Sequence, residues 1–199
     1  MTRVTPLPLD RWDPELRAMS DADHGSPLEQ LMGGVNANSP EMAKAMLRFA
    51  GAMWTSTVLP KRLLELVRLR IAFHNQCRSC MAIRYQSAID DGLDEGAVCS
   101  LEKPYEAPGL SDREKAAIAY ADISSTNHFG ITDETFAELR RHFSEREIVE
   151  LGMFVAYFIG FGRLAAAMDM VEELPESFQD KAAKVAPWTH EKDAVAFRA

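Results

Sequence analysis

Apolar residues recur along most of the chain at the three- and four-residue spacing of one helix face, and alternating runs typical of strands are nearly absent. Ser39-Pro40-Glu41 places a capping residue before a proline, which predicts a helix reaching about Ser56. Leu59-Pro60 begins a second helix, whose apolar face continues to about His74. The pattern therefore predicts an all-α fold.

Later helix starts carry their own signals. Ser111 with Glu114, and Ser144 with Glu147, have the spacing of a capping box, and Thr132 begins a third helix between them. We expect helices over 112–124, 133–142 and 145–170. Earlier in the chain we expect a helix over 77–91, ended by Gly92, a short helix over 94–101 that carries Cys99, and a loop over 101–110.

The helix predicted over 145–170 is apolar on most sides. Its longest apolar stretch, 151–162 between Glu150 and Arg163, is shorter than the roughly 20 residues that cross a bilayer, so it indicates a buried helix. Such a helix must be covered all round, either by its own domain or by a second subunit. We therefore expect a homo-oligomer.

Length and composition favour one domain over 1–199, with an N-terminal extension over 1–38 and a charged tail over 171–199. The net charge of -8, without clustered Lys and Arg, excludes a general nucleic-acid binder. The start of the chain lacks the basic and apolar segments of a secretory signal, and three cysteines do not suggest a disulfide-stapled secreted domain. We expect a cytoplasmic protein with no membrane partner.

The segment Cys77-Arg78-Ser79-Cys80 is the main candidate for chemistry. Two thiols at this spacing can close and reopen a disulfide, and the start of a helix favours the thiolate over the thiol. The same spacing also occurs in half of a zinc site or in two buried core cysteines. Cys99 is expected to be a core cysteine outside this pair.

Three other residues are candidates near the thiols. In a continuous helix Arg84 lies one turn after Cys80, where its guanidinium favours the thiolate but cannot accept a proton; a solvated or ion-paired helix charge is the alternative. Glu65 has Arg68 three residues on, so an intrahelical ion pair is the favoured interpretation of this acid. If the chain turns back before Cys77, Glu65 instead faces the thiols and shuttles protons.

His74 precedes Cys77 by three residues and is a candidate ligand, base or polar helix end. A zinc site of Cys77, Cys80 and His74 with His128 or His142 is disfavoured, because no second Cys pair or paired-His spacing accompanies the first. We therefore expect no metal, and nothing in the sequence indicates a cofactor.

Glu65, the Cys77–Cys80 pair, Gly92, the segment 110–114 and the segment 116–122 follow in an order that resembles the alkyl hydroperoxidase D and carboxymuconolactone decarboxylase family. The resemblance covers about 46–170 and implies an all-helical, oligomeric bundle. In the peroxidase branch it implies that Cys80 attacks a peroxide, that Cys77 resolves the sulfenic acid, and that Glu65 assists proton transfer.

The peroxidase pattern has a histidine where this chain has Arg84, which implies that His74 or Tyr85 replaces it or that activity is weak. The resemblance favours a thiol-dependent hydroperoxide reductase with an external thiol donor. The alternatives are a lactone decarboxylase or isomerase with incidental cysteines, and a non-catalytic oligomeric binding module. The reductase and the decarboxylase interpretations both need Glu65 and the thiols to converge on a cavity, whereas the binding-module interpretation predicts that they do not.

Overall fold

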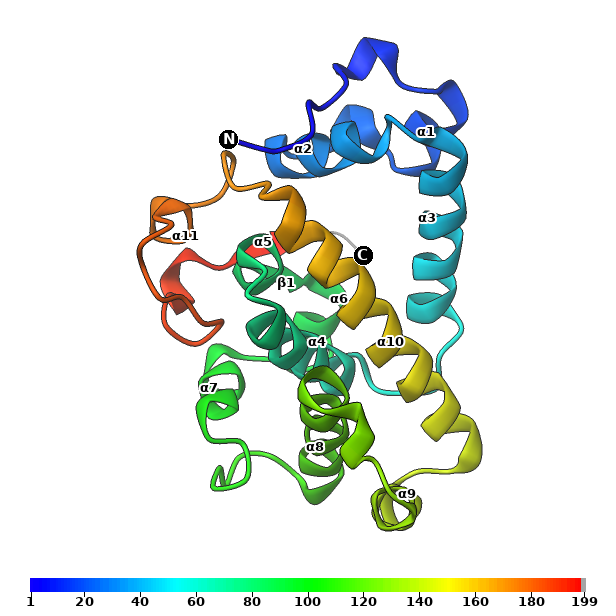
Figure 1. Ribbon diagram of the computed structural model, residues 1–199, viewed down its shortest axis with the longest axis vertical. Coiled ribbons are helices and arrows are strands. Elements are labelled where there is room, and N and C mark those ends of the chain that lie inside the picture. Colours follow the sequence, from blue (N-terminus) through cyan, green and yellow to red (C-terminus); the bar gives the residue numbers. More distant parts are fainter. Residues whose placement is uncertain (198–199) are drawn as a thin grey trace.

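The computed structural model describes residues 1–197 and is mostly helical (Figure 1). The all-α prediction is confirmed in outline, with one short parallel strand pair that the pattern did not predict. The helices are α1 (Pro14–Met19), α2 (Pro27–Asn36), α3 (Pro40–Thr55), α4 (Lys61–Asn75), α5 (Arg78–Ala82), α6 (Gln86–Asp90), α7 (Glu95–Cys99), α8 (Asp112–Thr126), α9 (Asp133–His142), α10 (Glu145–Met168) and α11 (Glu176–Gln179); the strands are β1 (Ile83–Tyr85) and β2 (Val195–Phe197).

The centre of the fold is α4, which packs against α8 and α10. Leu66, Val67, Leu69 and Ile71 of α4 are fully buried, so this helix has no solvent face along its middle. Burial of side chains of this size contributes about 1.5–3 kcal/mol each. The cysteine segment, Cys77 to Cys80, follows α4 almost directly, so its position depends on this well-packed helix.

The predicted capping boxes begin α8 and α10. The Ser111 hydroxyl accepts the Glu114 amide and the Glu114 carboxylate accepts the Ser111 amide; Ser144 and Glu147 repeat this arrangement. Each reciprocal pair satisfies backbone N–H groups that the helix itself cannot satisfy. These two starts therefore lie at the predicted residues.

The predicted helix over 77–91 is wrong in its middle. The chain forms α5, then the extended β1, then α6. Arg68 of α4 donates to the carbonyls of Cys80 and Ile83, two acceptors that a continuing helix would use for its own next turn. β1 instead pairs in parallel with β2, with Arg84 opposite Ala196.

The C-terminal segment 176–197 covers this region. Phe178 is fully buried against a cluster that contains Met81 and Ile83, and Cys80 packs at the edge of that cluster. The side chain of Arg78, between the two cysteines, donates to the carbonyls of Phe178 and Ala183. The tail predicted over 171–199 is thus folded over the segment Cys77 to Cys80.

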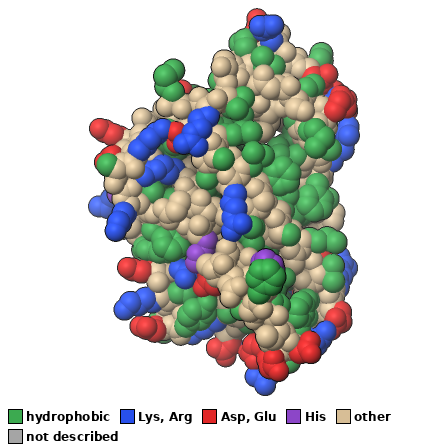
Figure 2. Space-filling model, in the orientation of Figure 1, with side chains coloured by type: hydrophobic (Ala, Val, Ile, Leu, Met, Phe, Trp, Pro, Cys, Tyr) green, Lys and Arg blue, Asp and Glu red, His purple; other side chains and the backbone are tan. Residues whose placement is uncertain are grey.

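α10 is long and apolar enough, by length and composition alone, to cross a membrane. In the fold it packs against α4, α5, α8 and α9. Its other side leaves Val149, Met153, Phe161 and Leu164 exposed. Figure 2 shows hydrophobic side chains gathered on the side of the molecule where α3 and α10 lie.

Candidate functional site

The turn between α4 and α5 presents the cysteine pair. Gln76 adopts a left-handed backbone conformation, φ 50°, which ends α4 and redirects the chain. Cys77 caps α5, its sulfur accepting the Cys80 amide at 3.3 Å. Cys77 and Cys80 form a disulfide with Cα atoms 5.2 Å apart, the pairing that the spacing predicts.

The two cysteine residues differ in access to solvent. Cys77 is fully buried, whereas Cys80 is partly exposed. Ser79, itself buried, places its hydroxyl 3.5 Å from the Cys77 sulfur. A small oxidant arriving from solvent therefore meets Cys80 first. Cys99 lies in α7, outside this disulfide.

Glu65 forms the favoured ion pair with Arg68 and is fully buried. Arg68 Nε lies 2.6 Å from one carboxylate oxygen and Nη2 lies 2.7 Å from the other. The second oxygen also accepts the Tyr85 amide at 3.1 Å. Glu65 therefore meets β1 directly, but it meets the cysteine segment only through Arg68.

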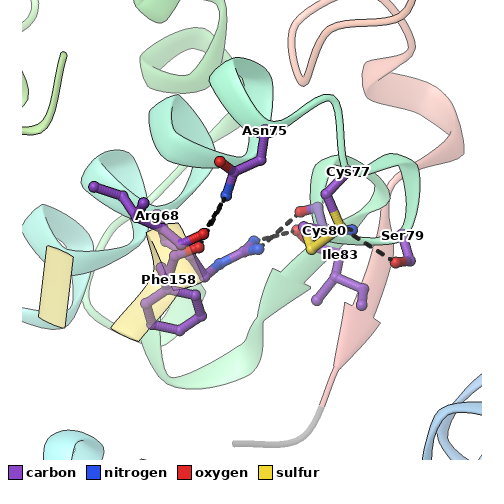
Figure 3. Close-up of a disulfide and its surroundings, with 8 residues drawn as sticks. Arg68, Asn75, Cys77, Ser79, Cys80, Ile83 and Phe158 are labelled. Atoms are coloured by element: carbon purple, nitrogen blue, oxygen red, sulfur yellow. Dashed lines mark hydrogen bonds between the residues drawn. A yellow bond between two sulfur atoms is a disulfide. The ribbon is translucent and has the colours of Figure 1, made fainter. Parts of the chain in front are cut away.

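Arg68 is the residue of this site that sequence reasoning did not assign a role beyond the ion pair. Its Nη1 donates to the Cys80 carbonyl and its Nη2 to the Ile83 carbonyl, each at 2.7 Å. Figure 3 shows the side chain reaching from α4 to these two carbonyls beside the disulfide. One guanidinium thus joins the Glu65 carboxylate to the segment that carries Cys80.

Tyr85 packs against the Arg68–Glu65 ion pair. Its ring lies against the Arg68 guanidinium, 5.0 Å from the centroid, and against Trp54 at 4.7 Å. Burial raises the pKa of Tyr85, so its hydroxyl is neutral at physiological pH. The aromatic cover keeps water from the Arg68–Glu65 pair.

Arg84 does not lie over the thiols, because the helix that was expected to place it there is interrupted. Its side chain is 2% exposed, and its Nε pairs with Glu95 at 2.9 Å. Its Nη atoms donate to the carbonyls of Met81, Ile83 and Pro187. In this position Arg84 links β1 to α7 through Glu95 and to the C-terminal segment through the Pro187 carbonyl.

His74 belongs to a different cluster. Its Nε2 lies 2.6 Å from Asp122 of α8, which Arg70 and Tyr105 also contact. Burial raises the pKa of Asp122, but hydrogen bonds from His74, Arg70 and Tyr105 outweigh that effect and hold it below its ordinary value. His74 thus joins α4 to α8 and is held away from the cysteine pair.

Two hollows on the described surface have other linings. One lies between α3 and α10 and is lined mainly by apolar residues such as Phe49, Met53 and Met153. The other lies beside the cysteine turn, between Gln76, Arg78 and Ser79 on one side and the end of α10 on the other. Neither hollow is lined by Glu65 or by the two cysteines. The convergence that the reductase and decarboxylase interpretations needed is therefore not found in either of them.

Comparison with known proteins finds a family match in the central part of the chain. Residues 40–122, which contain α3 to α7 and the cysteine pair, match the model of the carboxymuconolactone decarboxylase family. The uncharacterized protein Rv2313c of Mycobacterium tuberculosis is 38% identical over 87 residues. That match covers 44% of this chain and 31% of the relative, so the chain spans about a third of that protein's length.

Two solved structures share the fold. A protein of unknown function from Agrobacterium tumefaciens, ATU0492, assigned provisionally to antioxidant defence as AhpD, is 25% identical with a TM-score of 0.59, covering 67% of this chain and 91% of that chain. An uncharacterized peroxidase-related protein from Ralstonia eutropha, described as an alkylhydroperoxidase AhpD core, is 18% identical with a TM-score of 0.72. It covers 89% of this chain and 94% of that chain.

Proposed function

Because residues 40–122 belong to the carboxymuconolactone decarboxylase family and the chain has an AhpD-like fold, we propose that this protein is a thiol-dependent hydroperoxide reductase. The observation that carries the proposal is the Cys77–Cys80 disulfide with its unequal access: Cys80 is partly exposed and Cys77 is buried behind it. An attacking sulfur has to meet the oxidant, whereas a resolving sulfur has only to meet its neighbour.

In the proposed cycle, the Cys80 thiolate attacks the terminal oxygen of a hydroperoxide. The S–O bond forms as the O–O bond breaks, and the leaving alkoxide takes a proton from water to become an alcohol. Cys77, as its thiol, then attacks the Cys80 sulfenic acid, which gives the disulfide and one water molecule. An external dithiol supplies two electrons and two protons and is itself released as a disulfide.

The source of the alkoxide's proton follows from the geometry of Glu65. Both of its oxygens accept hydrogen bonds from Arg68, and one also accepts the Tyr85 amide, so the carboxylate faces these groups and not the sulfurs. His74 is hydrogen-bonded to Asp122 and Arg84 to Glu95, so neither side chain is directed at the sulfurs. The proposed cycle therefore does without the convergence of Glu65 and the sulfurs that we expected of an enzyme, and water serves as the acid. Because general acid catalysis is commonly worth roughly a hundredfold to ten-thousandfold, peroxide turnover is slow.

Thiol counting tests the proposal. The reduced protein should lose two thiols per chain when treated with one equivalent of an alkyl hydroperoxide, while Cys99 is retained. Peptide mapping should then find the Cys77–Cys80 bridge and no other. Retention of all three thiols at millimolar peroxide, or a bridge that includes Cys99, would contradict the proposed cycle. Cytoplasmic dithiol proteins are the expected electron donors.

We also propose that the protein works as a homo-oligomer joined through α10. Val149 and Met153 are about one turn apart on this helix, Phe161 and Leu164 follow about two turns later, and all four remain exposed. A second copy is an occupant that would remove these side chains from water.

Light scattering should find a multiple of 22.2 kDa at micromolar concentration. The double variant Met153→Glu/Leu164→Glu should shift the mass towards 22.2 kDa, because paired carboxylates oppose burial at the contact. A matched double variant at exposed positions of α9, Glu134→Gln/Arg141→Gln, should leave the mass unchanged. A parent protein that is monomeric throughout would contradict the assignment.

A further inference from the structure

Two buried arginines flank the cysteine segment, and their surroundings are closely matched. Arg68 and Arg84 are each 2% exposed, each pairs with a glutamate, and each donates a hydrogen bond to the Ile83 carbonyl. They differ in their other contacts: Arg84 also donates to the Pro187 carbonyl, and Arg68 lies against the Tyr85 ring. Arg68 also donates to the carbonyl of Cys80, whereas Arg84 donates to that of Met81.

We propose that Arg68 is the positioning residue that stabilises the reduced Cys80 as a thiolate, the role that the sequence had suggested for Arg84. The assignment rests on the proposed function only in taking Cys80 as the reacting sulfur. Arg68 acts by holding the Cys80 backbone and by setting the local charge; no direct contact between its guanidinium and the sulfur is invoked.

The first support for this assignment is the position of the cation. Arg68 Nη1 lies 2.7 Å from the carbonyl oxygen of Cys80. The guanidinium is therefore in contact with the residue that carries the sulfur. Figure 3 shows the guanidinium pointing towards Cys80 from α4. A cation near an ionisable group favours the anionic form of that group.

The second support is burial. Arg68 is covered by α4 and by the Tyr85 ring, so its attraction for a nearby anion is weakly screened by water and salt. Glu65 opposes the effect because it carries the countercharge, but it lies behind the guanidinium: its contacts are Arg68 and the Tyr85 amide. We therefore expect a positive electrostatic potential at Cys80, which the Glu65 carboxylate makes smaller.

Other charged groups on the elements around α5 have partners elsewhere. Arg78 donates to the carbonyls of the C-terminal segment, and Asp169, at the end of α10, pairs with Lys181. Arg84 pairs with Glu95, and His190 lies against the Phe178 ring. Among the side chains that the structure describes, Tyr85 also faces this segment, and its raised pKa keeps the hydroxyl neutral at physiological pH. Arg78 keeps its charge, because its partners are neutral carbonyls, and it stays the same in every variant compared below. Arg68 and Glu65 are the fully buried ion pair beside Cys80.

The test measures how the rate of Cys80 alkylation by iodoacetamide depends on pH, in a Cys77→Ser/Cys99→Ser background where Cys80 is the sole thiol. Relative to this parent, Arg68→Gln should raise the pH midpoint by about one unit or more, because the cation is lost. Glu65→Gln should lower the midpoint, because the opposing carboxylate is lost. The double variant Glu65→Gln/Arg68→Gln should lie above the parent.

Arg84→Gln is the matched control, because it also loses a buried ion pair next to Ile83. Its midpoint should stay within about 0.3 unit of the parent. Circular dichroism at each pH identifies variants that remain folded; if Arg68→Gln alone does not, Glu65→Gln and the charge-neutral double variant decide. Equal midpoints for the parent and every folded Glu65 or Arg68 variant would overturn the assignment, as would an equal shift in Arg84→Gln.

The readout requires no peroxide, so this test and that of the proposed function can fail separately. If peroxide leaves Cys80 reduced while the midpoints move as expected, the reductase proposal fails and the role of Arg68 stands. If peroxide oxidises Cys80 while the midpoints do not move, the role of Arg68 fails and the reductase proposal stands.

Discussion

Replacement of Cys80 by serine is expected to abolish peroxide reduction, with a loss of at least about a thousandfold in turnover. The reason is that a serine hydroxyl is not ionised at neutral pH, and Cys77 is fully buried and cannot meet the oxidant in its place. A coupled assay that follows oxidation of a small dithiol by an alkyl hydroperoxide measures the effect.

Two other cysteine variants give this experiment its controls. Cys77→Ser should still react once with peroxide and should accumulate a sulfenic acid at Cys80, which a dimedone adduct detects by mass spectrometry. Cys99→Ser should turn over like the parent, because Cys99 lies in α7 outside the disulfide. Full turnover by Cys80→Ser, or loss of turnover only in Cys99→Ser, would show that a different sulfur reacts.

Replacement of Arg84 by histidine, which restores the residue type of the peroxidase pattern, is expected to cost stability and to bring no gain in turnover. The imidazole is too short to reach Glu95 and the carbonyls of Met81 and Pro187 together. Each buried carbonyl left without this donor costs about 1–3 kcal/mol in the free energy of unfolding, which urea denaturation measures.

The control for Arg84→His is Arg141→His on α9. Arg141 also pairs with a glutamate, Glu138, but its side chain is 74% exposed, so its loss should cost less than about 1 kcal/mol. If Arg84→His unfolds like the parent and raises peroxide turnover, then the residue acts on the thiols and β1 does not hold it away from them.

The helices could be predicted from the sequence because their signals are local. Ser111 with Glu114 and Ser144 with Glu147 satisfy one another within a single turn, so the sequence alone contains both partners. β1 could not be predicted in this way. Its strand partner follows α11, far along the chain, and no local pattern around Ile83 contains Val195. The β-branched and aromatic flanks of Arg84 were a weak strand signal.

The same distinction explains the candidate site. The spacing of Cys77 and Cys80, and that of Glu65 and Arg68, lie within one helical turn and correctly predicted a disulfide and an ion pair. Predictions that depended on an unbroken helix failed with that helix, and Arg84 was the residue concerned. That Arg68 reaches from α4 to Cys80 depends on how two elements pack, which helical periodicity does not contain.

The pairing of β1 with β2 also orders events during translation. A ribosome synthesises the cysteine pair long before it reaches Val195, so the newly made chain carries both thiols before the strand that seats β1 exists. Closing so long a loop is slow compared with forming the local helices. The nascent cysteine pair is thus open to other thiols until Val195 has been synthesised, and a chain cut short before Val195 would keep the pair without part of its cover.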